Sequence, residues 1–425
     1  MKLKPIVASL VLVGLMPTAF AYDGKSVVVQ QAVVNQNSVI STVCSDAWFD
    51  RISIGGIGSI VGLLGSHDLP GSFAKTNNST DLFVNNANLL VDVALSHWSK
   101  FTLNVAYLGS PSQWQMTSID STSFQNYKVS HGIFADEAYV TFANLAKHPI
   151  YAKIGKMYVP FGEYSDQYIP WQIESPAQML SQTNGLAAVL GVAPCSGFYA
   201  SLFGLKGDTS PIDSKAHSIR NWGSKFGFSY NLEHFRAPDV HVNVNASYIH
   251  NIWDSLTFTP NTSAPRELLS KSDTFRDAVG GIGAHVDFAY KMLSIYADWV
   301  GTFKNLHDTY PPLAKYTSSS KFWGANVNAA CAFKTLSHDS SLGAGFQFSG
   351  NGQWFADKSV NKVGVGAVSG LFALVIPKWR ALAEYKISLC KYTDLSLIYA
   401  HSRSYDFSDG HRNANLGLAR LAVRF

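Results

Sequence analysis

Histidine and cysteine are the side chains here best suited to catalysis or metal binding, and neither type has the spacing of a known reactive motif. Cys44, Cys195, Cys331 and Cys390 lie far apart and form no C-x-x-C pair, so they indicate neither a redox motif nor a structural zinc site. They could form two disulfides in three different pairings, or stay reduced. The 13 histidines include no H-E-x-x-H or H-x-H arrangement, so we expect no bound metal and no cofactor.

Sequence markers of enzymes are also missing. The chain contains no G-x-S-x-G sequence, which carries the nucleophile of many hydrolases. Gly56-Ile-Gly58 and Gly364-Val-Gly366 lack a third glycine at the spacing of a dinucleotide-binding loop. We therefore predict that the protein is not an enzyme, and an enzyme is the weakest of the functions considered below.

The remaining candidates are polar side chains that alternate with apolar ones along the chain. They carry both signs of charge, so strong selectivity for anions or cations is not indicated. We expect most of them to solvate an aqueous interior, and together they would set the size and charge preference for solutes. These candidate pore-lining residues are Glu137, His241, Asn243, Asn245, His285, Asp287, Asp298, Asn326, Asn328, Arg380, Glu384 and Lys386.

The elements that must position these side chains are strands, because apolar and polar residues alternate with a period of two. In Val240–Ile249, His241, Asn243 and Asn245 share one face, opposite valines, alanine and tyrosine. A helix would scatter them around its circumference. We predict sixteen strands, centred on Arg51–Leu64, Leu82–Leu95, Lys100–Leu108, Phe134–Asn144, Tyr151–Phe161, Leu186–Ala193, Phe198–Lys206, Trp222–Tyr230, Val240–Ile249, Gly281–Tyr290, Met292–Thr302, Phe322–Ala332, Leu342–Ser349, Trp379–Leu389, Leu395–Ser404 and Asn415–Phe425.

Two arrangements fit such strands: a soluble β-sandwich and a transmembrane antiparallel β-barrel. The strands reach the length that crosses a bilayer when tilted. Several apolar faces end in an aromatic ring, as the girdles of membrane barrels do; these are Tyr107, Tyr248, Tyr290, Trp299 and Trp323. A sheet in lipid must have no edge, so we predict a closed barrel of about sixteen strands, wide enough for a water-filled lumen.

The N-terminal residues read as a targeting segment followed by a short extension. Lys2 and Lys4 precede the apolar run Ile6–Leu15, and Ala19-Phe20-Ala21 has the small-residue pattern of a cleavage site. We therefore expect residues 1–21 to be a signal peptide, residues 22–50 a polar periplasmic extension, and residues 51–425 the barrel. The net charge of +4 is too small to suggest a nucleic-acid partner.

The connection Gly162–Gly185 stands out among the longer polar ones. It carries Tyr164, Tyr168 and Trp171 directly after a predicted strand. We expect this loop either to cover the mouth of the barrel or to fold into the pore as a constriction. The apolar segment Val363–Ile376 could hold part of a further strand or another inward-folded segment.

One pair of segments resembles a known family. Glu137–Phe142 followed by Ile150–Gly162 is similar to the paired strands and turn of LbtU-type siderophore porins, and more distantly to phosphate-selective porins of the O/P type. The matching positions are Gly155, Lys156, Pro160, Phe161 and Gly162. The resemblance implies a 16-stranded outer-membrane barrel that takes up an iron-chelating siderophore. Phosphate-selective relatives use clustered Arg and Lys in the loop, and Gly162–Gly185 contains none.

The end of the sequence resembles the closing strand of bacterial outer-membrane barrels. Leu421, Val423 and Phe425 share one face, with Arg420 and Arg424 on the other. The resemblance implies that the barrel-assembly machinery reads Phe425 and that lipid surrounds the barrel. An energy-coupled receptor with a plug and 22 strands needs more residues than this chain supplies.

These features predict an outer-membrane channel for passive or weakly selective uptake of small solutes, a siderophore among them, without an energy-coupled plug. A surface-exposed structural or adhesive barrel is the alternative.

Overall fold

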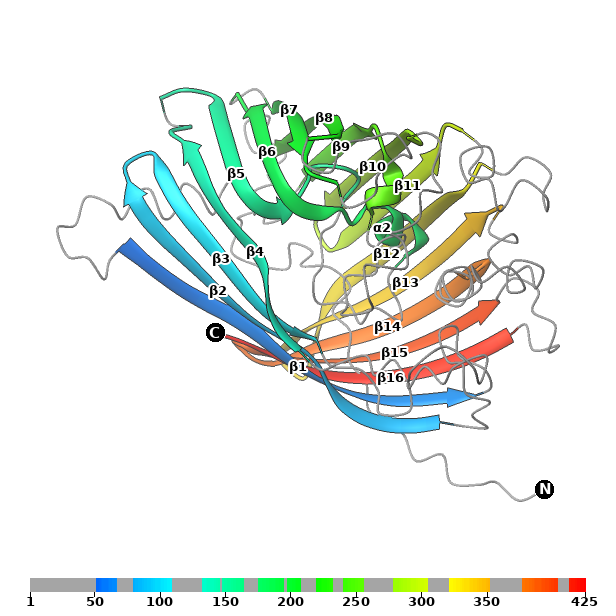
Figure 1. Cartoon of the computed structure of the whole chain (residues 1–425). Coiled ribbons are helices and arrows are strands. Elements are labelled where there is room, and N and C mark those ends of the chain that lie inside the picture. The colour runs from blue at the N-terminus through cyan, green and yellow to red at the C-terminus, as the bar shows by residue number, and fades with distance from the viewer. Residues whose placement is uncertain are drawn as a thin grey trace, which may run out of the picture.

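The protein is a closed barrel of sixteen antiparallel strands in a computed structural model (Figure 1). Each strand pairs with the one before and after it in sequence, and β1 pairs with β16 to close the cylinder. The structure describes residues 51–66, 79–108, 132–145, 147–163, 175–194, 197–207, 219–231, 240–255, 278–304, 321–351, 377–403 and 413–425.

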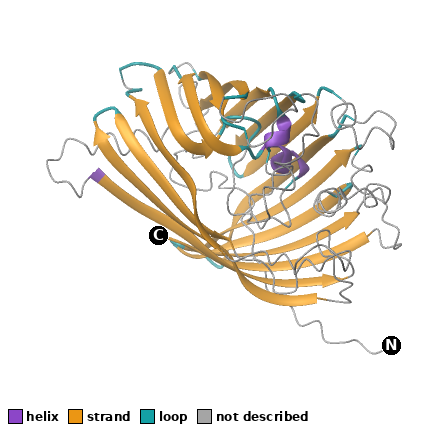
Figure 2. Cartoon of the chain, in the orientation of Figure 1, coloured by secondary structure: helices purple, strands orange, loops and turns teal. Residues whose placement is uncertain are grey.

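The strands have the following bounds: β1 Ile52–Ser66, β2 Ser79–Ser96, β3 Ser99–Leu108, β4 Gly132–Ala143, β5 Ile150–Tyr158, β6 Asn184–Val192, β7 Phe198–Leu205, β8 Asn221–Asn231, β9 Val240–Ile249, β10 Gly281–Tyr290, β11 Leu293–Thr302, β12 Trp323–Thr335, β13 His338–Gly350, β14 Trp379–Cys390, β15 Thr393–Arg403 and β16 Asn413–Arg424. In the described part of the chain, two short helical elements accompany them, α2 at Pro176–Ser181 and the 3-10 turn η4 at Ile252–Asp254. Figure 2 shows how fully strands dominate the described residues.

The sixteen predicted strands are confirmed in number and order. The largest differences lie at strand ends. β12 and β13 run further than predicted because a two-residue turn at Leu336–Ser337, with both residues at positive φ, joins them directly. β5 stops at Tyr158, short of the predicted Phe161. Pro160 has no N–H to give to the ladder, and the Phe161 N–H donates to the Val159 carbonyl at 2.7 Å, a tight three-residue turn.

The two faces of the wall differ in polarity. On β9, His241, Asn243 and Asn245 are buried, whereas Val244 is 44% exposed. Other outward side chains are large and apolar, among them Ile54, Leu186, Leu202 and Phe226. An exterior of this kind is stable only against lipid or another apolar surface. The outer face therefore carries the apolar band that a transmembrane barrel requires.

Strand connections alternate in length around the barrel. Two-residue turns follow β2, β10, β12 and β14. The connections after odd-numbered strands are longer, as barrels with short turns at one rim and long loops at the other predict. No helix among the described residues is long and apolar enough to cross a membrane.

Several predicted segments lie outside the described residues. These are residues 1–50 with Cys44, the loop aromatics Tyr164, Tyr168 and Trp171, Cys195, and the segment Val363–Ile376. Cys331 and Cys390 are free thiols.

Candidate functional site

The connection between β5 and β6 begins where the chain leaves the barrel wall. The Val159 N–H donates to the Thr183 carbonyl at 2.9 Å, which brings the two ends of the connection together. Gly162 then has φ +63°, and a Cβ there would collide with the Ser181 side chain. Because only glycine fits this backbone and this space, residues 162 and 163 can turn back onto the interior wall.

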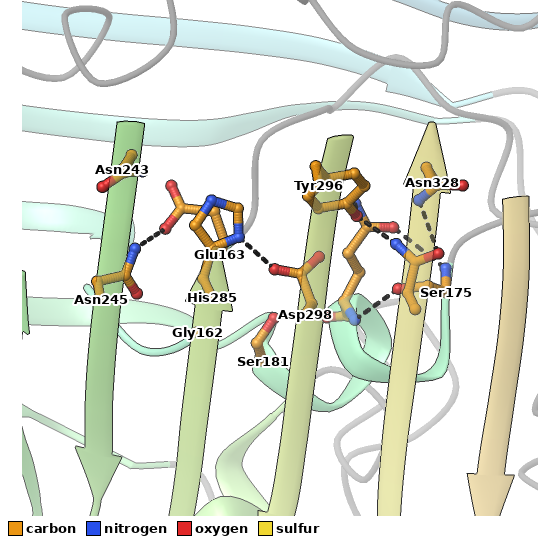
Figure 3. A network of polar contacts seen from close by, with 12 residues as sticks. Gly162, Glu163, Ser175, Ser181, Asn243, Asn245, His285, Tyr296, Asp298 and Asn328 are labelled. Carbon is orange, nitrogen blue, oxygen red and sulfur yellow. Dashed lines mark hydrogen bonds and ion pairs between the residues drawn. The ribbon is translucent and has the colours of Figure 1, made fainter. Parts of the chain in front are cut away.

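The first anchor of this segment lies on β8 and β9. The Gly162 N–H donates to Ser247 Oγ at 2.7 Å, and Lys225 Nζ donates to the Gly162 carbonyl at 3.0 Å. Lys225 also pairs with Glu163 Oε2 at 2.5 Å. Asn245 Nδ2 donates to the same oxygen at 3.2 Å, as Figure 3 shows. Both sides of the turn are therefore fixed to the barrel.

The charges around the first anchor favour the ionised form of the Glu163 carboxylate. Burial alone would raise the pKa of Glu163, but the positive charges of Lys225 and His285 outweigh it. Hydrogen bonds from Lys225 and Asn245 act in the same direction. The pKa of Glu163 is held below its usual value, so the carboxylate stays charged at neutral pH.

The second anchor is the helix α2, which lies against β11 and β12. Ser175 caps it by accepting from the Gln178 N–H at 3.1 Å, while Gln178 Oε1 accepts from the Ser175 N–H at 3.1 Å. Gln178 Nε2 donates to the Tyr296 hydroxyl at 3.3 Å. Asn326 Nδ2 donates to the same hydroxyl, so three elements meet at one oxygen. All six residues of α2 are buried.

Apolar packing joins the two anchors to the mouth of the barrel. Phe161, Leu180, Ile252 and Phe322 are almost completely buried and belong to one hydrophobic cluster. Ile252 belongs to η4, at the start of the connection after β9. Asn221 holds that turn in place: its Nδ2 donates to the Asn251 carbonyl at 2.7 Å and to Asp254 Oδ2 at 2.8 Å. The described parts of two connections, those after β5 and β9, therefore pack against each other in one apolar cluster.

The predicted polar residues on β9 to β12 form one continuous patch beside these anchors. His285 Nδ1 lies 2.5 Å from Asp298 Oδ1, and His241 Nε2 lies 3.6 Å from Asp287 Oδ2. Asn328 Nδ2 donates to Asn326 Oδ1 at 2.7 Å. The Tyr199 hydroxyl donates to Asn243 Oδ1 at 3.0 Å. Asn243, Asn245, Asn326 and Asn328 are all buried on this wall.

The other predicted polar residues lie on separate strands. On β14, Arg380 donates to Gln347 Oε1 at 3.1 Å, and Lys386 Nζ lies 3.5 Å from Asp394 Oδ2. Glu384 on the same strand is buried, as is Arg420 on β16. Glu137 on β4 accepts from the Tyr158 N–H at 3.4 Å.

The residues of the resembling motif have different surroundings. Gly155 has φ +141°, and a Cβ there would lie 2.6 Å from Tyr139 Cα, so glycine is required. Lys156 Nζ donates to the Ala135 carbonyl at 2.7 Å on the exposed side. Pro160, Phe161 and Gly162 form the turn into the first anchor. On the closing strand, Leu421, Val423 and Phe425 are exposed, and Phe425 exchanges backbone hydrogen bonds with Gly56.

Sequence reasoning missed Glu163, Lys225, Gln178 and Tyr296. Lys225 could have been found from the sequence. It lies on the same face of β8 as Asn221, Gly223 and Gly227, and this small or polar face alternates with a face that carries large aromatic residues. Glu163 and Gln178 lie in a predicted loop, where no periodicity indicates a side chain's direction. Within the described ranges, no group of three or more His, Cys, Asp or Glu side chains could hold a metal ion.

Comparisons with known proteins find distant relatives and solved structures with the same barrel fold. No family model matches the chain. A UPF0422 protein of Coxiella burnetii is 25% identical over 275 residues, covering 64% of this chain and 52% of the relative. A UPF0422 protein of Legionella pneumophila is 22% identical over 352 residues, covering 78% of this chain and 56% of the relative. The chain thus spans about half the length of these relatives, 52% and 56%.

Solved structures share the fold. The outer membrane channel DcaP of Acinetobacter baumannii has a TM-score of 0.52 at 13% identity, covering 88% of this chain and 97% of that one. OprB of Pseudomonas putida has a TM-score of 0.53 at 9% identity, covering 93% and 97%. The resemblance to siderophore porins gains no support from these comparisons and stays a hypothesis.

Proposed function

We propose that the protein is an outer-membrane channel that lets small hydrophilic solutes cross passively. One observation carries this proposal: a closed sixteen-stranded barrel holds an inward segment, residues 159–163 and 175–183, against a polar interior wall. A barrel of this strand number encloses a lumen that its own wall side chains do not fill. A segment anchored inside that lumen narrows the passage and sets a size limit.

The charges along the described interior support weak selectivity. Glu163 is paired with Lys225, Asp92 with Lys100 at 3.2 Å, and Asp394 with Lys386. Paired charges of opposite sign leave little net field to favour one sign of solute. We therefore propose a channel that discriminates by size more than by charge.

A siderophore is the finer proposal for the solute. It rests on the resemblance of Gly155, Lys156, Pro160, Phe161 and Gly162 to siderophore porins. The last three of these residues form the turn into the inward segment. A deletion strain should then grow poorly on iron bound to its native siderophore and normally on free iron.

The outward face supports the proposed surroundings. Exposed Ile54, Leu186, Leu202 and Phe226 would contact outer-membrane lipid. We propose that the barrel-assembly machinery recognises β16 together with Phe425, which follows it and bonds Gly56 of β1.

Conductance across a planar bilayer tests the channel itself. Purified protein should give discrete current steps, and liposomes that contain it should swell in small sugars more quickly than in large ones. Protein that inserts as a folded barrel and gives no steps would contradict the channel and favour a structural or adhesive barrel.

A further inference from the structure

We propose that Gly324 on β12 is the positioning residue that sets how far α2 protrudes into the lumen, and hence the size limit of the channel. The inference rests on the proposed channel function and adds to it the residue that determines the bore.

The contact between Gly324 and α2 is closer than any side chain would allow. A Cβ built on Gly324 would lie 2.6 Å from both the carbonyl carbon and the Cβ of Pro176, and 2.9 Å from the Ala177 nitrogen. Two of these three atoms are backbone, which cannot rotate away as the end of a side chain can. The first turn of α2 therefore rests directly on the wall where β12 has no side chain.

A hydrogen-bond network that includes Asn326 of β12 also holds α2. Asn326 lies two residues after Gly324, so both face the interior, and its amide shares the Tyr296 hydroxyl with Gln178. Tyr296 comes from β11, which is paired with β12 along Gly324 to Asn328. The hydrogen bonds hold α2 at this height on the wall, and the missing side chain decides its distance from the wall.

At the first anchor, another wall glycine also lies close to the inward segment, but less closely than Gly324. A Cβ on Gly283 of β10 would lie 3.2 Å from Gly162 Cα and 2.8 Å from Ser247 Oγ. The nearer atom is the end of a side chain that can rotate. Gly324 is thus the position where an added methyl group must move the inward segment itself.

A methyl group at Gly324 would displace the helix, because the strand cannot yield. β12 is paired on both sides, with β11 and with β13. Ordinary contacts begin near 3.4 Å, so relief of the overlap needs a shift on the order of 1 Å. The wall lies behind α2, so this shift points toward the lumen and narrows the passage.

Gly343 on β13 supplies the matched control. It is also buried in the next strand, and a Cβ there would meet its nearest atoms, the Ala329 carbonyl oxygen and Ala330 Cβ, at 3.7 Å. Gly343→Ala adds the same methyl group and the same change in backbone freedom without touching α2.

The experiment compares wild type, Gly324→Ala and Gly343→Ala by single-channel conductance, by liposome swelling in sugars of increasing size, and by hydrogen exchange. Gly324→Ala should lose roughly a tenth to a fifth of the conductance, lower the size limit, and speed exchange of the Met179 and Gln182 amides. Those amides donate to Ser175 and Gln178 carbonyls at 2.9 and 3.0 Å. Gly343→Ala should match wild type in all three measurements.

Two results would overturn the inference: a Gly324→Ala channel identical to wild type, or an equal change in Gly343→Ala. If Gly324→Ala does not fold, hydrogen exchange in the wild type tests the inference. Met179 and Gln182 amides that exchange as fast as those of an unstructured peptide would show that α2 is not packed on the wall. A wild-type barrel that gives no current contradicts the proposed function instead, while the exchange comparison still tests the placement of α2.

Discussion

The ion pair between Glu163 and Lys225 links the inward segment to the barrel wall through two opposite charges. Both side chains are mostly buried, at 18% and 12% exposure, so loss of one charge leaves the other poorly solvated. Glu163→Gln should lower the free energy of unfolding by about 1–3 kcal/mol and speed hydrogen exchange at the Gly162 amide. Urea unfolding in detergent micelles measures the first effect.

Asp339→Asn is the control for this substitution. Asp339 pairs with Lys334 at 3.6 Å, but the two side chains are 55% and 63% exposed. Exposed pairs contribute little, so Asp339→Asn should unfold like wild type. Equal effects of the two substitutions would mean that the Glu163–Lys225 pair contributes no more to stability than a surface ion pair.

The same carboxylate predicts a response to acid. Its pKa in the folded protein is depressed below the usual 4.5, so its contribution to stability is present above that value. The contribution is lost as the pH falls through the lower folded pKa. The Glu163 contribution to conductance should therefore be lost only at pH values below 4.5, the usual value of a glutamate carboxyl. In Glu163→Gln, that part of the acid response should be absent.

At the scale of elements, η4 depends on one amide side chain. Asn221 donates twice and accepts once from the Asn251 N–H at 2.9 Å, with no exposed surface. Asn221→Ala removes three hydrogen bonds from buried groups, which should cost about 2–4 kcal/mol and loosen residues 251–255 in hydrogen exchange. Asn351→Gly removes an exposed bond of the same kind, to the Lys321 carbonyl at 2.8 Å, at a backbone of positive φ that glycine adopts without strain, and should change neither measurement.

Strands could be predicted from the sequence, whereas the site could be predicted only in part. His285 and Asp298 alternate with apolar residues, so their shared face follows from local sequence. The position of the inward segment depends on partners that are distant in sequence. Gly162 bonds Ser247, 85 residues away, and Gln178 bonds Tyr296, 118 residues away. No local pattern reports such pairs, because loop residues lack a period that indicates which side faces the wall.

At the scale of the whole molecule, every inference requires the outer face to lie in lipid. Leu202, in the middle of β7, is 64% exposed on that face, and Leu336, in the turn between β12 and β13, is 89% exposed at the rim. An arginine costs about 2–4 kcal/mol at the centre of a bilayer and about 0–1 at its edge. Leu202→Arg should therefore destabilise the barrel in vesicles by about 2–4 kcal/mol, and Leu336→Arg by less than about 1.

Reversible urea unfolding from lipid vesicles separates this prediction from a soluble barrel. In water, both leucines are exposed, and replacing either one by arginine would change the free energy of unfolding little. The difference between the two variants therefore reports the depth of each site in the bilayer, since the substitution itself is identical. Two equally small effects would show that the apolar exterior contacts something other than lipid. That result would contradict the proposed location of the channel in a membrane.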